Sequence, residues 1–185
     1  MSFLEMLLLA TGLAMDSFSV SLGASTSGHE IDRRAALRLA FHLGFFQFLM
    51  PVVGWYLGSS VAEVISSVDH RIAFGLLILV GGRTIRAGFS DDVAAYTTNP
   101  SRGLTMVILS VATSIDALAV GLSFAALGVR VWIPAAVIGL TASTMTLIGT
   151  FGGRALGIRF GSRMAVIGGI VLVAIGVWIV IDHVV

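Results

Sequence analysis

Two aspartates, Asp16 and Asp116, each lie in the middle of a long apolar stretch of the sequence. At ~1.5 Å of helix per residue, both carboxyl groups would sit roughly 18–20 Å from the side on which their helix enters, near the middle of a bilayer. A carboxylate at that depth is costly unless it is paired, hydrated or bound to a metal, so it marks a functional site by default. No basic residue lies at comparable depth, which leaves a protonated Asp bonded between helices as the structural alternative.

The chemistry open to two buried carboxylates depends on what lies between them. Left alone they would repel each other and one would hold a proton, whereas a divalent cation would neutralise both. The sequence contains no Cys, and oxygen ligands from carboxylates, amides, hydroxyls and carbonyls suit hard cations such as Mg²⁺, Ca²⁺ or Mn²⁺. The residue types do not choose among these three ions.

Gln47 is a further candidate ligand, in the middle of another apolar stretch and four residues before Pro51. A proline within a helix frees the carbonyl oxygen four residues earlier, so Gln47 offers a side-chain and a main-chain oxygen. We predict Asp16, Asp116 and Gln47 as the metal ligands. Small and hydroxyl-bearing residues at helical spacing could line a cavity around them, although helix packing and bonds to the helix backbone explain such residues as well. These candidates are Gly12, Ser19, Gly23, Thr113, Ser123, Thr141 and Thr144.

The composition identifies the elements that must position these residues. Of the 185 residues, 57% are hydrophobic and only 11% are charged, whereas soluble domains carry about 25% charged residues. A membrane-spanning helix needs about 20 apolar residues, and six stretches of the chain qualify. They are residues 3–24, 38–59, 71–89, 104–127, 131–152 and 163–183. We therefore predict an all-α polytopic membrane protein, in which residues 1–185 form a single transmembrane domain.

The two halves of the chain resemble each other at corresponding positions. The stretch with Asp16 aligns with the stretch with Asp116, and glycines of the second and third stretches align in order with glycines of the fifth and sixth. The pairs are Gly44 and Gly139, Gly54 and Gly149, Gly58 and Gly153, Gly75 and Gly169, and Gly82 and Gly176. Three spans is an odd number, so the second half crosses in the opposite direction. We predict a 3+3 inverted repeat, with repeat 1 at about residues 1–90 and repeat 2 at about 103–185.

The arginines predict the orientation of the six spans. Every basic residue apart from the histidines is Arg, and nine of the eleven arginines flank the loops on one side of the predicted bundle. Basic residues accumulate in the cytoplasmic loops of membrane proteins. We therefore expect this side to be cytoplasmic and both termini to lie outside the cytoplasm.

Around the two aspartates, the sequence resembles the bacterial manganese efflux pump family (MntP). The likeness rests on residues 12–23 and 112–121, with support from residues 51–55 and 73–83, and it extends over nearly the whole chain. It implies an exporter of Mn²⁺ in the bacterial inner membrane, with Asp16 and Asp116 as the acidic site residues. Some members of the family resemble this chain in having Gln at position 47, while others have Glu there.

We therefore expect a secondary-active exporter of Mn²⁺, driven by returning protons, in which the metal is a transported substrate and no cofactor is needed. Inverted repeats are common in such transporters and place the site near the midplane. The sequence has no nucleotide-binding loop, no indication of a nucleic-acid partner and no paired nucleophile that would suggest an enzyme. The alternatives are export of another cation or of a small solute such as an amino acid, a passive divalent-cation channel, and a scaffold without transport. An oligomer is not required, because one chain supplies both repeats.

Overall fold

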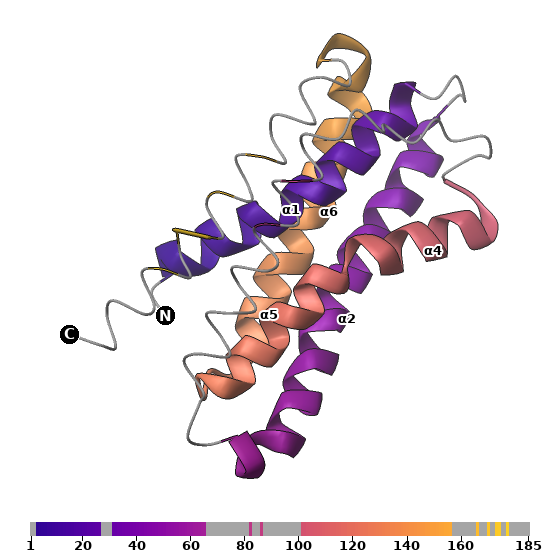
Figure 1. The fold of residues 1–185 in the computed structure, drawn as a ribbon. Coiled ribbons are helices and arrows are strands. Elements are labelled where there is room, and N and C mark those ends of the chain that lie inside the picture. Colours follow the sequence, from indigo (N-terminus) through magenta and orange to yellow (C-terminus); the bar gives the residue numbers. More distant parts are fainter. Residues whose placement is uncertain are drawn as a thin grey trace.

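The computed structural model describes residues 3–26, 31–65 and 101–156, together with the single positions 82, 86, 166, 170, 173, 174 and 177. The elements of this part of the chain are all α-helices (Figure 1). They are α1 (Phe3–Thr26), α2 (Arg33–Ile65), α4 (Gly103–Thr113), α5 (Ile115–Ala126) and α6 (Trp132–Leu156).

Four segments of the described chain are long and apolar enough to cross a membrane. They are Phe3–Ser25, Arg33–Ser60, Gly103–Ala126 and Trp132–Gly153. These segments coincide with four of the six predicted stretches and confirm the all-α membrane class. The other two predicted stretches, 71–89 and 163–183, lie outside the described residues except for isolated helical positions.

Helix α2 begins five residues before the predicted stretch because Asp32 caps it. The Oδ1 atom of Asp32 accepts a hydrogen bond of 2.7 Å from the backbone N–H of Ala35, and its carbonyl oxygen accepts one of 2.9 Å from the N–H of Ala36. An Asp at this position satisfies backbone donors that the first turn of a helix otherwise leaves open. The cap lies outside the apolar stretch, which explains why hydropathy alone misses the first turns of α2.

The fourth predicted stretch is divided at Ser114, which separates α4 from α5. Ser114 has φ −98° and ψ 3°, and its backbone N–H is shared between the carbonyl oxygens of Ser110 at 3.2 Å and Val111 at 3.1 Å. The hydroxyls of Ser110 and Thr113 also donate to carbonyls four residues earlier, at 2.8 and 2.7 Å. Such side-chain bonds compete with the backbone ladder and bend membrane helices. The predicted continuous helix over 104–127 is therefore two helices in series.

Close approaches at glycine hold the helices together. Helix α2 crosses α6 where Gly44 faces Gly139, and a Cβ added to either would lie 2.8 Å from the carbonyl oxygen of the other. Ser143 on α6 donates to the carbonyl oxygen of Ala40 on α2 at 3.1 Å and joins the same crossing. Small residues at helix crossings let backbones approach closely, which is a main source of packing energy in a bilayer.

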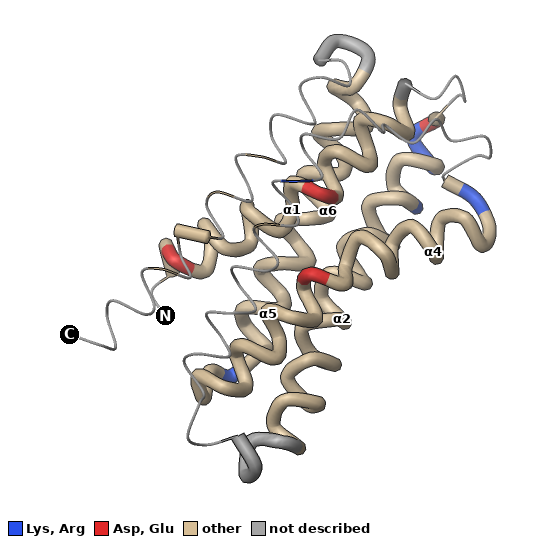
Figure 2. Tube along the Cα trace, viewed as in Figure 1, with Lys and Arg blue, Asp and Glu red and all other residues tan. Residues whose placement is uncertain are grey.

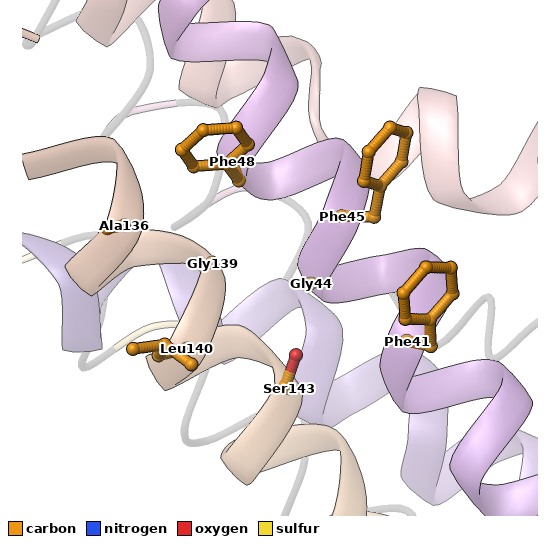
Figure 3. Close-up of a pocket in the computed structure, with 8 residues that line it drawn as sticks. All are labelled: Phe41, Gly44, Phe45, Phe48, Ala136, Gly139, Leu140 and Ser143. Carbon is orange, nitrogen blue, oxygen red and sulfur yellow. The ribbon is translucent and has the colours of Figure 1, made fainter. Parts of the chain in front are cut away.

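Beside this crossing is an open apolar groove of about 370 Å³ between α2 and α6 (Figure 3). Three phenylalanines of α2, at positions 41, 45 and 48, line one side of it, and Ala136 and Leu140 of α6 line the other. None of the predicted metal ligands contributes to this lining. The groove is a feature of the outer surface of the helices, because Phe41 is 65% and Leu140 70% exposed.

The largest core cluster joins four of the five helices. It contains Leu9, Ala10 and Leu13 of α1, Val52 of α2, Ala117, Val120 and Phe124 of α5, and Ala135 and Ile138 of α6, together with Val131. Charged residues are sparse along the helices, and most of them lie near helix ends (Figure 2). Two acidic positions lie in the interior of the predicted spans, one within α1 and one in the first turn of α5. The predicted site residues therefore belong to an otherwise apolar bundle.

Candidate metal site

The predicted aspartates occupy different local environments. Asp16 lies within the unbroken helix α1, between the buried residues Met15 and Ser17, and is itself half-buried. Asp116 is also half-buried and lies in the first turn of α5, directly after the break at Ser114. A carboxylate in the first turn of a helix is stabilised by the helix dipole. The break therefore provides local compensation for the charge of Asp116.

Gln47 lies close to the helix that carries Asp16. Its side chain is only 1% exposed, and its Nε2 atom donates a hydrogen bond of 3.3 Å to the carbonyl oxygen of Leu13 on α1. Leu13 precedes Asp16 by three residues, and residues at this spacing share one face of a helix. The structure thus brings the Gln47 carboxamide within one helical turn of the Asp16 position.

Three buried side-chain oxygens in this region have no hydrogen-bond partner among the described residues. They are Oγ of Ser17, Oε1 of Gln47 and Oγ of Ser114. Their residues are 0%, 1% and 0% exposed. Leaving a buried polar atom unpartnered costs about 1–3 kcal/mol, so such atoms in a folded protein call for an explanation.

Sequence reasoning missed Ser17 and Ser114. Ser17 is adjacent to Asp16, and Ser114 precedes Asp116 by two residues, so both belong to the motifs that carry the aspartates. This adjacency can be read from the sequence. That the two hydroxyls do not bond their own helix backbone, as helical serines usually do, can be seen only in the packed structure.

Most of the predicted cavity-lining hydroxyls do make that usual bond. Each donates to the carbonyl oxygen four residues earlier in its own helix. These hydroxyls belong to Ser19 (2.9 Å), Thr113 (2.7 Å), Ser123 (3.1 Å) and Thr144 (2.8 Å). Gly12 and Gly23 are buried in α1, Thr141 is half-buried in α6 and Thr144 is exposed. The four hydroxyls have thus used their one donor within their own helices.

Clusters of three or more His, Asp or Glu side chains suited to a metal do not occur within the described residues. A cation bound near the aspartates would therefore also need neutral oxygens from amide, hydroxyl or carbonyl groups. That donor set is the one hard divalent cations accept.

Comparison with known proteins gives a consistent family. The family model described as "Putative manganese efflux pump" (Mntp) matches residues 30–180. The chain belongs to this family. A relative from Geobacter sp. strain M21 is 50% identical over 183 residues, covering 99% of this chain and 98% of the relative. Another Mntp relative, from Syntrophotalea carbinolica, is 46% identical over 176 residues, covering 95% of this chain and 94% of the relative.

A third relative, from Nitratidesulfovibrio vulgaris, is 45% identical over 186 residues, covering 99% of this chain and 92% of the relative. All three relatives are named "Putative manganese efflux pump MntP". The predicted resemblance to the Mntp family is therefore confirmed. No solved structure matches the chain.

Proposed function

We propose that this chain exports Mn²⁺ across the bacterial inner membrane as a secondary-active transporter. The observation that carries the proposal is the full-length likeness to relatives named as manganese efflux pumps. The four apolar spans and the two aspartates within them agree with it. Asp16 and Asp116 would bind the metal with help from Gln47, and proton return to an aspartate would accompany its release to the outside.

The contacts among the described helices support the further proposal of a 3+3 inverted repeat. A Cβ on Gly149 of α6 would meet the carbonyl oxygen of Phe18 on α1, and a Cβ on Gly54 of α2 would meet the carbonyl oxygen of Leu118 on α5. The next turns repeat the pattern, with Gly153 against Leu22 and Gly58 against Leu122. Each α1–α6 contact thus has a counterpart between α5 and α2, with the halves exchanged. A twofold relation between the halves accounts for this equivalence.

In this arrangement alternating access would follow from movement of one repeat against the other around a site near the midplane. Asp16 and Asp116 are equivalent positions of the two repeats, so each half would supply one carboxylate. A divalent cation would neutralise both charges, and a proton would replace part of that charge when the metal leaves. This exchange is the physical basis proposed for coupling metal export to proton entry.

The test is manganese export by cells that lack their own manganese exporter. Expression of the parent chain should lower cellular manganese and restore growth in manganese. Asp16→Asn and Asp116→Asn should each abolish the effect, because the amide keeps the shape of the side chain but loses its charge. Glu5→Gln is the matched control, since it removes a carboxylate from the first turn of α1, near the helix end. An unchanged manganese content with the parent chain would refute the proposed export.

The coupling is tested separately in membrane vesicles. Dissipating the proton gradient should stop uphill movement of Mn²⁺ if the protein is an antiporter. Movement that only follows the manganese gradient, whatever the proton gradient, would identify a passive channel instead.

A further inference from the structure

We propose that Ser17 and Ser114 are cation ligands, which with Oε1 of Gln47 complete the coordination that the two aspartates begin. This inference rests on the proposed function and extends it to the uncharged ligands of the site. It comes from three buried oxygens that have no hydrogen-bond partner among the described residues, each belonging to a side chain at least nine-tenths buried.

The hydroxyl of Ser17 is unpartnered for a specific reason. Helical serines in this chain usually donate to a carbonyl oxygen three or four residues earlier, as Ser19 does to Met15 at 2.9 Å. One of the two such acceptors for Ser17 is the carbonyl oxygen of Leu13, and that atom accepts a hydrogen bond from Gln47 at 3.3 Å. A contact between helices therefore competes with the bond that would hold the hydroxyl against its own helix, and the hydroxyl has no partner among the described residues.

Ser114 lies at the helix break. Its backbone N–H is shared between the carbonyl oxygens of Ser110 and Val111, at 3.2 and 3.1 Å, and its buried hydroxyl has no hydrogen-bond partner among the described residues. By contrast, the hydroxyl of Ser110, one turn earlier and equally buried, donates to the carbonyl oxygen of Met106 at 2.8 Å. The hydroxyl before the break, on Ser110, is therefore hydrogen-bonded to its own helix, whereas the hydroxyl at the break, on Ser114, is not.

The unpartnered oxygens of Ser17 and Gln47 both lie at the same part of α1. The bond from Gln47 to Leu13 places the carboxamide on the face of α1 that carries Ser17, because residues four apart share a helix face. Gln47 donates through Nε2 and keeps Oε1, which is buried, as an acceptor. The unpartnered oxygens of α1 and α2 therefore lie within about one helical turn of each other.

The third oxygen is brought to the same level by the packing of α5 along α2 (Figure 1). Gly58 packs against Ala125, and the carbonyl of Pro51 packs against Gly121, so both helices advance in the same direction. One turn back along both chains, Gln47 comes level with the segment from Ser114 to Ala117. Ala117 and Leu13 belong to one core cluster, which also includes residues of α2 and α6.

The chemistry of this cluster favours a cation. The last carbonyls of α4 point toward the break, and the C-terminal end of a helix carries partial negative charge that stabilises cations. Broken helices in transporters coordinate ions through such ends. Hydroxyl and amide oxygens added to two carboxylates give the all-oxygen set that Mn²⁺, Mg²⁺ and Ca²⁺ accept. The positions of Ser17 and Ser114 beside the aspartate motifs fit this assignment.

The test is Mn²⁺ binding to the purified full-length protein in detergent, measured by calorimetry. Ser17→Ala and Ser114→Ala should each raise the Kd for Mn²⁺ about tenfold or more, the size of effect seen when groups around a metal are removed. Both variants should remain at least as abundant as the parent in the membrane, because each loses an unpartnered buried hydroxyl. The matched controls are Ser21→Ala and Ser110→Ala, whose equally buried hydroxyls donate to their own helices at 2.7 and 2.8 Å.

A second pair of variants tests the ligand role through ion preference. The chain has no Cys, so Ser17→Cys and Ser114→Cys each introduce a single soft ligand. If the side chain touches the ion, affinity for Cd²⁺ should rise relative to Mn²⁺, since thiolates prefer softer metals. Ser110→Cys should leave the ratio unchanged.

The outcomes separate this inference from the proposed function. If the parent binds Mn²⁺ and both alanine variants bind it equally well with no change of ion preference in the cysteine variants, the serine assignment is wrong and manganese export stands. If the parent binds Mg²⁺ or Ca²⁺ but not Mn²⁺, the proposed substrate is wrong, and the same variants test the ligands with the ion that binds. A parent that binds none of these ions overturns both.

Discussion

At the scale of single residues, Gln47 links two roles that are usually separate. Its amide nitrogen holds α2 against the Leu13 carbonyl of α1 at 3.3 Å, while its amide oxygen remains unpartnered among the described residues. A carboxamide can do both because one end donates and the other accepts. The residue therefore both positions the helix that carries Asp16 and supplies a candidate ligand.

These two roles predict different results for two substitutions. Gln47→Leu removes both the donor and the acceptor, and it should weaken Mn²⁺ binding about tenfold or more, as loss of a group around a metal does. Gln47→Glu keeps an oxygen for the cation and adds charge, and it should bind Mn²⁺ at least as well as the parent. Calorimetry with the purified variants measures both. Equal binding by the leucine variant and the parent would exclude Gln47 from the site.

The candidate site could be predicted from the sequence only in its charged part. Asp16 and Asp116 stand out because ionisable groups in apolar stretches are rare, and Gln47 stands out by its depth. Ser17 and Ser114 do not stand out, since hydroxyls in membrane helices ordinarily bond their own backbone. The open hydroxyl of Ser17 lies beside a contact from another helix, which leaves no mark in the local sequence, and that of Ser114 lies at a break that hydropathy does not predict.

At the scale of helices, the four described spans were predictable and the break was not. Residues 104–127 are predominantly apolar and contain no proline, so hydropathy predicts one continuous helix. The interruption at Ser114 follows from the run of hydroxyl residues at positions 110, 113 and 114, which offers the backbone alternative hydrogen bonds. Helix α1 runs through the equivalent region without a break, so the two aspartate helices differ in local structure despite their similar sequences.

The glycine contacts between helices predict that Gly→Ala substitution lowers the stability of this protein, whereas it usually raises the stability of a helix. Replacing a helical Gly with Ala normally stabilises by about 1 kcal/mol through helix propensity. At Gly54 and Gly149 a Cβ would meet the backbone of the facing helix, so Gly54→Ala and Gly149→Ala should each destabilise by about 1–3 kcal/mol through overpacking. Thermal unfolding of the purified protein in detergent measures the change.

Ala112→Val is the control for added bulk, since Ala112 is exposed on α4. Its stability should match that of the parent. If the two glycine positions are equivalent in the proposed repeats, their alanine variants should be destabilised to a similar extent. Stabilisation of either variant would show that the helices do not approach as closely as the structure has them.

At the scale of the whole molecule, the distribution of arginine predicts which way the bundle faces. Arg34 lies exposed at the start of α2, and Arg130 lies exposed between α5 and α6. The two are on opposite ends of the predicted spans, and nine of the eleven arginines are on the side of Arg34. From the bias toward basic residues in cytoplasmic loops, we predict that Arg34 lies inside and Arg130 outside.

The absence of Cys from the chain makes this orientation directly measurable. Arg130→Cys should react with a membrane-impermeant maleimide in intact spheroplasts, and Arg34→Cys should react only after the membrane is opened. Each substitution removes one arginine and leaves the strong imbalance between the two sides, so neither should reverse the protein. Labelling of Arg34→Cys from outside would show that the orientation is the reverse of the predicted one. Export would then need the aspartates to load from the side that carries the termini and to release on the arginine-rich side.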